Sequence, residues 1–354
     1  MIQVVTSFFM AFCVCYLAMP SIIRIAISRG IVDAPDYRKS HHTVTPSFGG
    51  VGIFLGFSLI TLLLVPSQDM DQLRYILAAL FVIFLVGARD DLDPLSPLAK
   101  LTGQLIGIGL LMFSADIRLT SLQGIFGFYE LNIISSYILT GTLFVFLINS
   151  FNLLDGIDAL CASISILILS IIGTWFLMVG EVFYSILAIT TAGATLAFLK
   201  YNISPSKIFM GDTGSLLLGA VCSISIIKML QFNIDLVLSD YRFDSVMAIA
   251  IGLLILPVFD TTRVFLLRIL KGKSPFLPDK NHIHHLLLDL GLSHMQSTAL
   301  LLLVNTGFLL LSIQLQEINA TLFIFISLAI AIGLYQILML SLSLKKAGVI
   351  RTEP

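Results

Sequence analysis

Long apolar runs separated by short polar segments are the feature that most constrains this chain. A run of about 20 apolar residues is long enough to cross the hydrocarbon core of a bilayer as a helix. Only 12% of the 354 residues are charged, whereas soluble globular proteins carry about 25%. The polar stretches are too short to form a separate soluble domain. The sequence therefore predicts an all-α integral membrane protein with a single polytopic membrane domain over residues 1–354.

Eleven of these runs are expected to form transmembrane helices. Their approximate centres are Cys13, Phe57, Phe81, Ile106, Leu143, Ile168, Thr190, Cys222, Leu254, Leu303 and Ile330. The second run opens with Gly49, Gly50, Gly52 and Gly56. Small residues of this kind favour tight packing against a neighbouring helix.

The basic residues predict how the helices are oriented. With the N-terminus outside, only Arg74, Arg118 and Arg242 fall in outer loops, and Lys228 lies near an outer helix end. All other lysines and arginines then lie in inner loops or in the C-terminal tail. Because cytoplasmic loops carry an excess of Lys and Arg, we expect a periplasmic N-terminus and a cytoplasmic C-terminus. The outer segment 116–132 alternates apolar and polar residues around two glycines, which predicts a small periplasmic β-hairpin.

The unusual polar clusters share one side of the membrane in this arrangement. They fall in the predicted inner loops 29–48, 89–100, 149–160, 200–215 and 266–296. Transporters more often hold their acids near the bilayer midplane, so acids at one interface favour chemistry between a soluble substrate and a lipid head group. The formal net charge of -1 provides no overall field that would attract nucleic acid.

Three carboxylates, those of Asp90, Asp91 and Asp93, crowd into one helical turn. Like charges this close repel each other unless a cation or a lysine compensates, and Lys100 follows shortly along the chain. One interpretation is a phosphate site organised by a metal ion or by basic residues. The other is a solvated loop, or a helix N-terminus where acids are favourable.

A second polar series has members three residues apart, namely Asn149, Asn152, Asp155 and Asp158. On a helix, consecutive members of the series are neighbours and form a ridge. Their carboxylate and amide oxygens suit Mg²⁺, or a ribose and a base edge. The alternative is a polar loop in which the two acids cap helices.

Asp212 lies in a Gly-Asp-Thr-Gly-Ser stretch that opens an apolar run. It is either an ordinary helix N-cap or a carboxylate ligand for Mg²⁺, next to backbone N–H groups that attract phosphate.

His282, His284 and His285 fall within four positions of one another. A zinc site is one interpretation, although no thiolate or closely matched acid completes it. The histidines could instead bind a diphosphate or relay a proton. A polar interfacial segment without chemistry is the remaining alternative.

Taken in order, these segments resemble the bacterial polyprenyl-phosphate N-acetylhexosamine-1-phosphate transferases of glycosyltransferase family 4. The resemblance runs from about Asp33 to Leu292. It rests on five motifs: Asp-Ala-Pro-Asp-Tyr-Arg-Lys-Ser-His-His followed by Pro-Ser-Phe-Gly-Gly, Asp-Asp-Leu-Asp with Lys100, Asn-Leu-Leu-Asp-Gly-Ile-Asp, Phe-Met-Gly-Asp-Thr-Gly-Ser, and His-Ile-His-His. Each motif is modest alone, but in this order on one membrane face the five are specific.

The resemblance implies an eleven-helix enzyme of the bacterial cytoplasmic membrane, with its active site facing the cytoplasm. It implies bound Mg²⁺, with Mn²⁺ as an alternative ion. The implied substrates are a UDP-N-acetylamino sugar and undecaprenyl phosphate. The implied products are UMP and a diphosphate-linked sugar lipid that starts a cell-surface polysaccharide. A homodimer is left open.

Roles for individual residues also follow from the resemblance. Asp212 would be the principal metal ligand and Asn152 a second one. Asp90 and Asp91 occupy the place of the acceptor-activating pair, in which one acid takes the phosphate proton and the other helps to organise the site with Lys100. The remaining implied set contains Asp155 and His282 as catalytic residues, and Arg38, Lys39, Asn149, Gly156, Asp158, Phe209, His284 and His285 as substrate contacts, with Gly156, Asp158 and Phe209 near the uridine and the histidines at the donor diphosphate.

The histidine motif indicates a branch of the family. The peptidoglycan transferases typically carry three successive histidines, whereas His-Ile-His-His resembles the N-acetylglucosamine-1-phosphate branch. We therefore expect N-acetylglucosamine 1-phosphate as the transferred group. Two positions depart from the family pattern: Ala159 replaces a glycine, and Ser47 stands where an arginine is frequent in this branch.

Two other classes of protein are alternatives. An intramembrane prenyltransferase of the UbiA type also uses aspartate-rich motifs with Mg²⁺, but it has no use for the Gly-Asp-Thr-Gly-Ser or His-Ile-His-His motifs. A secondary transporter or lipid flippase would place acids at mid-span and show internal pseudo-symmetry, and the sequence has neither feature.

Overall fold

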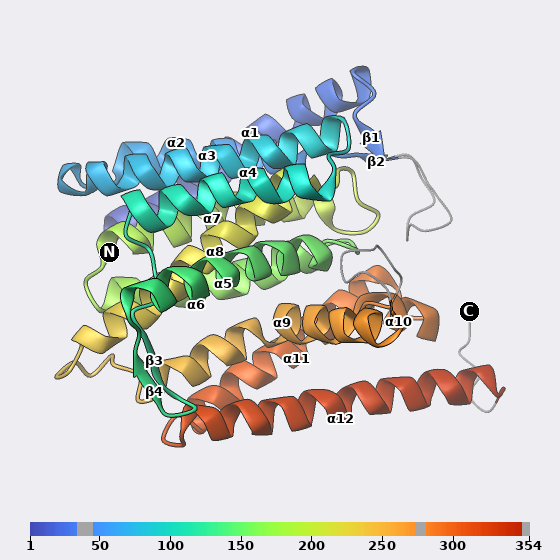
Figure 1. Cartoon of the computed structure of the whole chain (residues 1–354). Coiled ribbons are helices and arrows are strands. Elements are labelled where there is room, and N and C mark those ends of the chain that lie inside the picture. Colours follow the sequence, from blue (N-terminus) through green and yellow to red (C-terminus); the bar gives the residue numbers. More distant parts are fainter. Residues whose placement is uncertain (34–44, 273–280, 349–354) are drawn as a thin grey trace.

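The computed structural model describes residues 1–33, 45–272 and 281–348. These residues form a layered bundle of long helices that run alongside one another (Figure 1). The helices are α1 (Ile2–Ser28), α2 (Gly49–Leu64), α3 (Met70–Leu92), α4 (Pro97–Gly109), α5 (Ile133–Leu154), α6 (Leu160–Met178), α7 (Val182–Asn202), α8 (Gly211–Asp235), α9 (Val246–Leu270), α10 (Ile283–Leu290), α11 (His294–Gln314) and α12 (Ala320–Lys346). A 3₁₀ turn (Ser67–Asp69) precedes α3, and a π turn (Leu110–Ser114) extends α4.

Ten of the described helices are long and apolar enough to cross a membrane. A further apolar helix, α2, is shorter, with 16 residues. Every predicted centre falls on one of these apolar helices, so their placement is confirmed. The short helix α10 was not predicted. It lies in the segment 266–296 and begins within the histidine motif.

The predicted hairpin in segment 116–132 is present. Strands β3 (Ser121–Ile125) and β4 (Phe128–Glu130) are antiparallel. Phe126 and Gly127 form the two-residue turn between them, with φ of 51° and 80°. Positive φ at both central residues is what a type I′ hairpin turn requires. The hairpin lies at the end of the bundle opposite to α10 and to the small pair β1 (Val32–Asp33) and β2 (Thr45–Pro46) (Figure 1).

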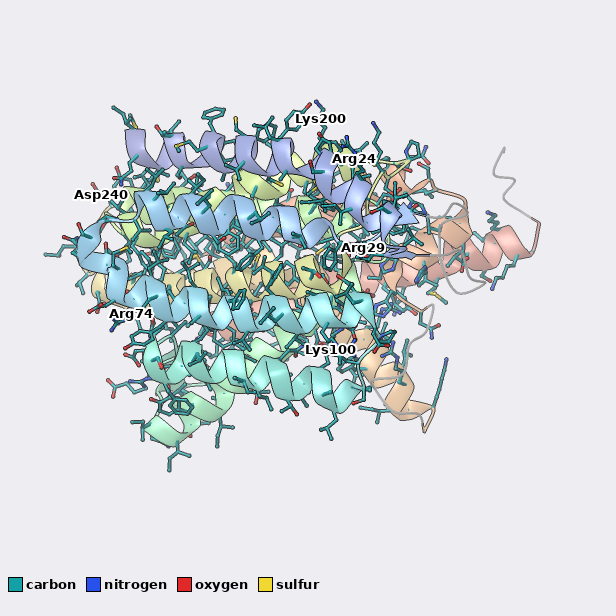
Figure 2. All side chains as sticks on the ribbon, turned by 90° about the horizontal axis from the view of Figure 1, so that it is seen from above. Arg24, Arg29, Arg74, Lys100, Lys200 and Asp240 are labelled. Carbon is teal, nitrogen blue, oxygen red and sulfur yellow. The ribbon has the colours of Figure 1, made fainter. Side chains whose placement is uncertain are left out.

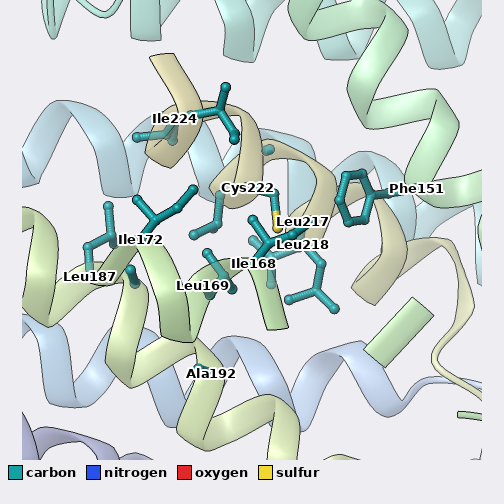
Figure 3. Packing of buried hydrophobic residues seen from close by; sticks show 14 of the residues in the cluster. Phe151, Ile168, Leu169, Ile172, Leu187, Ala192, Leu217, Leu218, Cys222 and Ile224 are labelled. Carbon is teal, nitrogen blue, oxygen red and sulfur yellow. The ribbon is translucent and has the colours of Figure 1, made fainter. Parts of the chain in front are cut away.

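Helix α8 lies at the centre of the bundle. Every residue from Thr213 to Leu230 is buried, as expected for a helix that is apolar on all sides. Side chains of α5, α6 and α7 pack around it (Figure 3). The labelled residues of this cluster are Phe151, Ile168, Leu169, Ile172, Leu187, Ala192, Leu217, Leu218, Cys222 and Ile224. This enclosure fixes the position of the first turn of α8, which carries Asp212.

Glycines allow α2 and α3 to approach α8 closely. A Cβ on Gly50 would lie 2.2 Å from the backbone nitrogen of Gly214, and a Cβ on Gly87 would lie 2.5 Å from the carbonyl oxygen of Asp212. No side chain fits at either distance, because the atoms it would meet are backbone. The packing role predicted for the glycines that open α2 is therefore confirmed.

Pro257 interrupts the hydrogen bonding of α9. A proline has no N–H, so it leaves the carbonyl of Leu253 without its usual partner. The side-chain amide of Asn305, on α11, donates to this carbonyl at 3.1 Å and accepts the N–H of Leu256 at 3.3 Å. Helix α9 can therefore continue past the proline and carry Asp260 in the following turn.

Candidate active site

The predicted site residues that the structure describes gather at the end of the bundle that carries β1, β2 and α10 (Figure 1). Lys100 lies at this end together with Arg24, Arg29 and Lys200, and Arg74 lies at the other end (Figure 2). Two predicted substrate contacts, Arg38 and Lys39, are outside the described residues.

Lys100 is the centre of a cluster of acids and amides, which we call the acid–lysine cluster (Asp90, Lys100, Asn152 and Asp212). Its ammonium group forms an ion pair with the carboxylate of Asp212. It also lies 3.5 Å from Asp90 Oδ2 and 3.5 Å from Asn152 Oδ1. Asn152 donates to Asp212 Oδ1 at 2.8 Å. Side chains from α3, α4, α5 and α8 thus meet around one positive charge.

The acid–lysine cluster is partly open to solvent. The side chains of Lys100, Asp90 and Asp212 keep 18%, 20% and 23% of their surface exposed. Lys100 is placed by the start of α4, where Ser96 accepts the N–H of Ala99 and a proline occupies the first helical position. A soluble anionic substrate can therefore reach a charge that the fold holds in place.

Asp91 is bound differently from Asp90. Its Oδ1 accepts the backbone N–H of Asp212 at 2.8 Å, and its Oδ2 accepts the N–H and the hydroxyl of Thr213 at 3.0 Å and 2.5 Å. The first N–H groups of a helix have no partner within the helix, so a carboxylate from α3 caps α8. Asp212 therefore lies within the first turn of α8 and is not its N-cap.

The turn before Asp212 requires a glycine at position 211. Its φ is 72°, a conformation that L-residues rarely adopt. A Cβ there would lie 2.4 Å from Asp91 Oδ2 and 2.7 Å from the hydroxyl oxygen of Ser47. Ser47, one of the two positions that depart from the pattern of the resemblance, thus lies against the turn that starts α8.

Asn149 lies one helical turn before Asn152 and pairs with Gln104 of α4. Its Nδ2 donates to Gln104 Oε1 at 2.8 Å, and Gln104 Nε2 lies 3.4 Å from Asn149 Oδ1. This amide pair joins α4 to α5 and so holds Lys100 and Asn152 side by side. The predicted substrate contact of Asn149 stays a prediction.

Asp155 and Asp158 lie in the turn between α5 and α6. Asp155 is surrounded by protein on most sides and makes no side-chain hydrogen bond or ion pair within the described ranges, and burial raises its pKa well above the usual value, helped by the charges of Asp91 and Asp158. Asp158 Oδ2 lies 3.3 Å from His294 Nδ1. Burial alone would raise the pKa of Asp158, but the bonds to His294 and to two serine hydroxyls outweigh burial and lower it.

The histidine cluster (His282, His284 and His285) packs against the same turn. A Cβ on Gly156 would lie 2.1 Å from His284 Nε2, so the imidazole lies directly on this glycine. The rings of His282 and His285 lie 5.6 Å and 4.3 Å from that of His284. Burial, together with the charge of His285, lowers the pKa of His284 to about 3, so its ring is neutral at physiological pH.

The end of α5 joins the two clusters into one site. Asn152 belongs to the acid–lysine cluster, and Gly156, four residues later, touches the histidine cluster. Phe209 reaches this end of the bundle through its backbone, which accepts the N–H of Gly49 at 2.9 Å and donates to Pro46 at 2.8 Å. Five segments that are far apart in sequence therefore converge, as the sequence predicted.

The oxygens of the acid–lysine cluster fit the predicted Mg²⁺. A cationic group, the Lys100 ammonium, already lies among oxygens of Asp90, Asn152 and Asp212. Mg²⁺ prefers such oxygens and usually takes only one or two protein carboxylates, with water and substrate phosphates completing its shell. The zinc interpretation is not supported, because the described ranges contain no group of three or more His, Cys, Asp or Glu side chains placed to hold a metal ion.

Asp260 and Arg263 of α9 belong to the site but were missed in the sequence. Asp260 Oδ2 lies 2.9 Å from His282 Nδ1, and Arg263 donates to Asp260 Oδ1 at 2.7 Å. The signal that could have identified them is an acid and an arginine three residues apart inside an apolar run. Ionisable residues are costly there and usually functional.

Comparison with known proteins agrees with this geometry. Residues 73–230 match the model of glycosyl transferase family 4. A probable undecaprenyl-phosphate N-acetylglucosaminyl 1-phosphate transferase of Bacillus subtilis is 35% identical over 321 residues, which cover 90% of this chain and 86% of the relative. The chain belongs to glycosyl transferase family 4. The segment matched by the family 4 model includes the whole acid–lysine cluster.

Two other relatives of this family 4 protein extend the likeness. An undecaprenyl-phosphate alpha-N-acetylglucosaminyl 1-phosphate transferase of Yersinia pestis is 30% identical, covering 79% of this chain and 75% of the relative. A decaprenyl-phosphate N-acetylglucosaminephosphotransferase of Mycolicibacterium smegmatis is 28% identical, covering 81% and 76%. The predicted family is confirmed, and family 4 membership replaces the prenyltransferase and transporter alternatives.

Proposed function

We propose that this family 4 enzyme transfers N-acetylglucosamine 1-phosphate from UDP-N-acetylglucosamine to undecaprenyl phosphate and releases UMP. The observation that carries the proposal is the junction at the end of α5, where the acid–lysine cluster meets the histidine cluster. Two anions must react at this site, and it offers a fixed ammonium group to offset their charge and imidazole rings whose N–H groups can donate to them. The names of the relatives support the choice of substrates.

The reaction needs one bond to form and one to break. An oxygen of the lipid phosphate attacks the sugar-proximal phosphorus of the donor, and the bond from that phosphorus to the oxygen bridging to UMP breaks. Transfer of this kind depends mainly on positioning and on neutralising charge. Lys100 supplies a positive charge for the reacting phosphates from its place among three oxygens.

Asp90 is the residue we assign to the proton of the lipid phosphate. Its Oδ1 accepts the N–H of Leu95 at 2.7 Å, and its Oδ2 is directed to the Lys100 ammonium at 3.5 Å. Both oxygens of Asp91 are already bound by the start of α8. The donor at Asp90 Oδ2 is the more distant of these contacts, and it comes from the Lys100 ammonium at the partly open cluster. We therefore assign the proton to Asp90 and a structural role to Asp91.

Asp212 and Asn152 are the residues that would hold Mg²⁺. When bound, the ion would neutralise charge on the donor diphosphate. The donor side of the site would be formed by the histidine cluster at the diphosphate, and by Gly156, Asp158 and Phe209 near the uridine. Asp155 lies between the two sides, and Arg38 and Lys39 would add positive charge.

We further propose that the chain crosses the bacterial cytoplasmic membrane eleven times, with α2 as the shortest span. The end that carries Lys100 also carries Arg24, Arg29 and Lys200 (Figure 2), and an excess of basic residues favours the cytoplasmic side. The site would then face the cytoplasm, where it meets the soluble donor. The hairpin β3–β4 would face the periplasm, and the lipid product would start a cell-surface polysaccharide.

Purified protein tests the proposal when it is supplied with undecaprenyl phosphate, Mg²⁺ and a panel of UDP-sugars. We expect UMP release with UDP-N-acetylglucosamine, its loss with EDTA, and its loss in Asp212→Ala. Asp116→Asn, an exposed acid at the opposite end, is the control that should keep full activity. Activity with another UDP-sugar alone would refute the donor assignment, and EDTA-resistant release in Asp212→Ala would refute the metal assignment.

A further inference from the structure

Asp260 makes contacts that tie the histidine cluster to α9. Its Oδ2 lies 2.9 Å from His282 Nδ1, and its Oδ1 accepts the backbone N–H of Ile283 at 3.0 Å. Asp260 and His282 each keep only 4% of their surface exposed. One buried carboxylate therefore binds the imidazole of His282 and also caps the first turn of α10, just as Asp91 caps α8.

Arg263 makes a buried acid tolerable at this position. Its Nη2 donates to Asp260 Oδ1 at 2.7 Å and also to the carbonyl of Asn281. Its guanidinium group lies 4.6 Å from the ring centroid of Tyr335 on α12, a distance suited to a cation–π contact. The negative charge of Asp260 is thus paired with the positive charge of Arg263. Removing either side chain would leave a buried unpaired charge and strongly destabilise the fold.

The carboxylate of Asp260 determines which nitrogen of His282 can meet a ligand. An ionised carboxylate only accepts hydrogen bonds, so His282 Nδ1 must carry a proton. Nε2 is then the ring nitrogen left for a ligand, and no residue in the described part of the chain hydrogen-bonds to it.

We infer that Asp260 is a positioning residue for this enzyme: it acts through His282, by fixing the tautomer and the orientation of that ring for the donor diphosphate. This inference rests on the proposed function, in which the histidine cluster meets the diphosphate. Asp260 touches no substrate itself. Arg263 holds Asp260, and Asp260 holds His282.

The substitution Asp260→Asn can separate the effect of Asp260 on the His282 ring from its effect on the stability of the fold. Asp260 Oδ1 faces two donors, Arg263 Nη2 and the N–H of Ile283. An asparagine must turn its only oxygen to those donors, which keeps the cap of α10. Its NH₂ group then faces His282 Nδ1, so that nitrogen has to become an acceptor and the proton moves to Nε2. Asp260→Asn therefore changes the tautomer of His282 and removes the charge while leaving α10 capped.

The kinetic test compares the wild type with Asp260→Asn, His282→Asn and the double variant. We expect kcat/KM for UDP-N-acetylglucosamine to fall about 10- to 100-fold in Asp260→Asn, the range for a hydrogen bond to a charged group, mainly through a higher KM for the donor. The KM for undecaprenyl phosphate should change less than about twofold. In the His282→Asn background, Asp260→Asn should add less than about twofold, because a residue that acts through His282 has nothing left to act on.

Two results would overturn the inference in this experiment: an unchanged donor KM in a folded Asp260→Asn protein, or losses that multiply in the double variant. Asp260→Glu keeps the carboxylate and should recover part of the activity. Asp116→Asn makes the same chemical change at the far end of the bundle and should have no effect. If the wild type releases no UMP, the proposed function has failed, and the tautomer of His282 must be judged by spectroscopy.

¹⁵N NMR of histidine-labelled protein reports the tautomer of His282 without an activity assay. The His282 signals are assigned by their loss in His282→Asn, which is practical because the chain has only six histidines. We expect a protonated Nδ1 in the wild type and a protonated Nε2 with a bare Nδ1 in Asp260→Asn. A wild-type ring with a bare Nδ1 would overturn the inference even if Asp260→Asn does not fold.

Discussion

The carboxylate of Asp91 accepts the backbone N–H of Asp212 at 2.8 Å. An acid on α3 therefore holds in place the acid in the first turn of α8. The neighbouring acid, Asp90, is directed instead to Lys100. Asp90 and Asp91 are adjacent in the sequence but have different roles. Asp91 maintains the geometry of the site, and Asp90 is placed for chemistry.

Exchange of each acid for asparagine should separate these duties. Asp91→Asn keeps one acceptor oxygen but turns an NH₂ group toward the other N–H donor of α8, so we expect the free energy of unfolding to fall by about 1–3 kcal/mol. Asp90→Asn should change stability by less than about 1 kcal/mol but lower kcat by about 10²-fold or more. Apparent Tm in detergent and UMP release measure the two effects. The opposite ordering of stability losses would contradict the assignment.

Gly211→Ala should damage the same cap from the other side. The new Cβ would lie 2.4 Å from Asp91 Oδ2, so we expect a stability loss of about 3 kcal/mol or more from backbone strain and displacement of the carboxylate. Gly180→Ala is the matched control, because Gly180 also has a positive φ but nothing lies within 4 Å of its Cβ position. The control should lose only about 1–2 kcal/mol. Equal losses would mean that contact with Asp91 is unimportant.

The buried ring of His284 should make stability depend on pH. Its folded pKa of about 3 lies below the usual value because the ring is buried, and the unfolded value is about 6.5. Between these values the unfolded chain binds a proton that the folded chain does not. Stability from this group is therefore complete above about pH 6.5 and is lost as pH falls toward 3, by at most about 1.4 kcal/mol per pH unit.

His284→Leu tests this pH dependence. Neither ring nitrogen of His284 has a hydrogen-bond partner within the described ranges, so an apolar side chain should fold well in its place. The drop in apparent Tm between about pH 7 and about pH 5 should be smaller in the variant than in the wild type. The other histidines are common to both proteins and cancel in the comparison. An equal or larger drop in the variant would contradict a neutral, buried His284.

Ala159 stands where the family pattern has a glycine, and restoring that glycine should change the stability of the protein. Its φ of 69° places an alanine in the left-handed region, which costs an L-residue about 1–2 kcal/mol. Glycine removes this strain but gives the unfolded chain about 0.5–1 kcal/mol more freedom, so Ala159→Gly should stabilise the protein by up to about 1 kcal/mol. Ala162→Gly, inside α6, should instead destabilise it by about 1 kcal/mol. A fall in apparent Tm in both variants would contradict this explanation.

Much of the fold could be predicted because a bilayer demands long apolar helices. The centres of the apolar helices and the hairpin between Ser121 and Glu130 both followed from residue patterns. Helix α10 did not, since its eight residues are amphipathic and lie within a polar segment. The strand pair β1–β2 also escaped prediction, because two-residue strands leave no periodicity to detect.

The candidate site was predictable in its members but not in its contacts. Spacing predicted that Asn149 and Asn152 share one face of a helix, and α5 confirms this. It did not predict the contact of Gly156, in the following turn, with His284, 128 residues away. The capping of α8 by Asp91 depends on how α3 packs against α8, which no local pattern records. Asp260 was missed because its only signal is the arginine three residues later, and both lie inside an apolar run, apart from the polar segments that carry the motifs.

The fate of the two donor phosphates tests the central claim most directly. UDP-N-acetylglucosamine labelled with ³²P at the sugar-proximal phosphate is incubated with the purified protein, Mg²⁺ and undecaprenyl phosphate, and the lipid and water phases are then separated. Transfer of the intact sugar phosphate should carry the label into the lipid, with unlabelled UMP left in the water phase. Label that stays in the water phase as UDP, while the sugar enters the lipid, would contradict the claim.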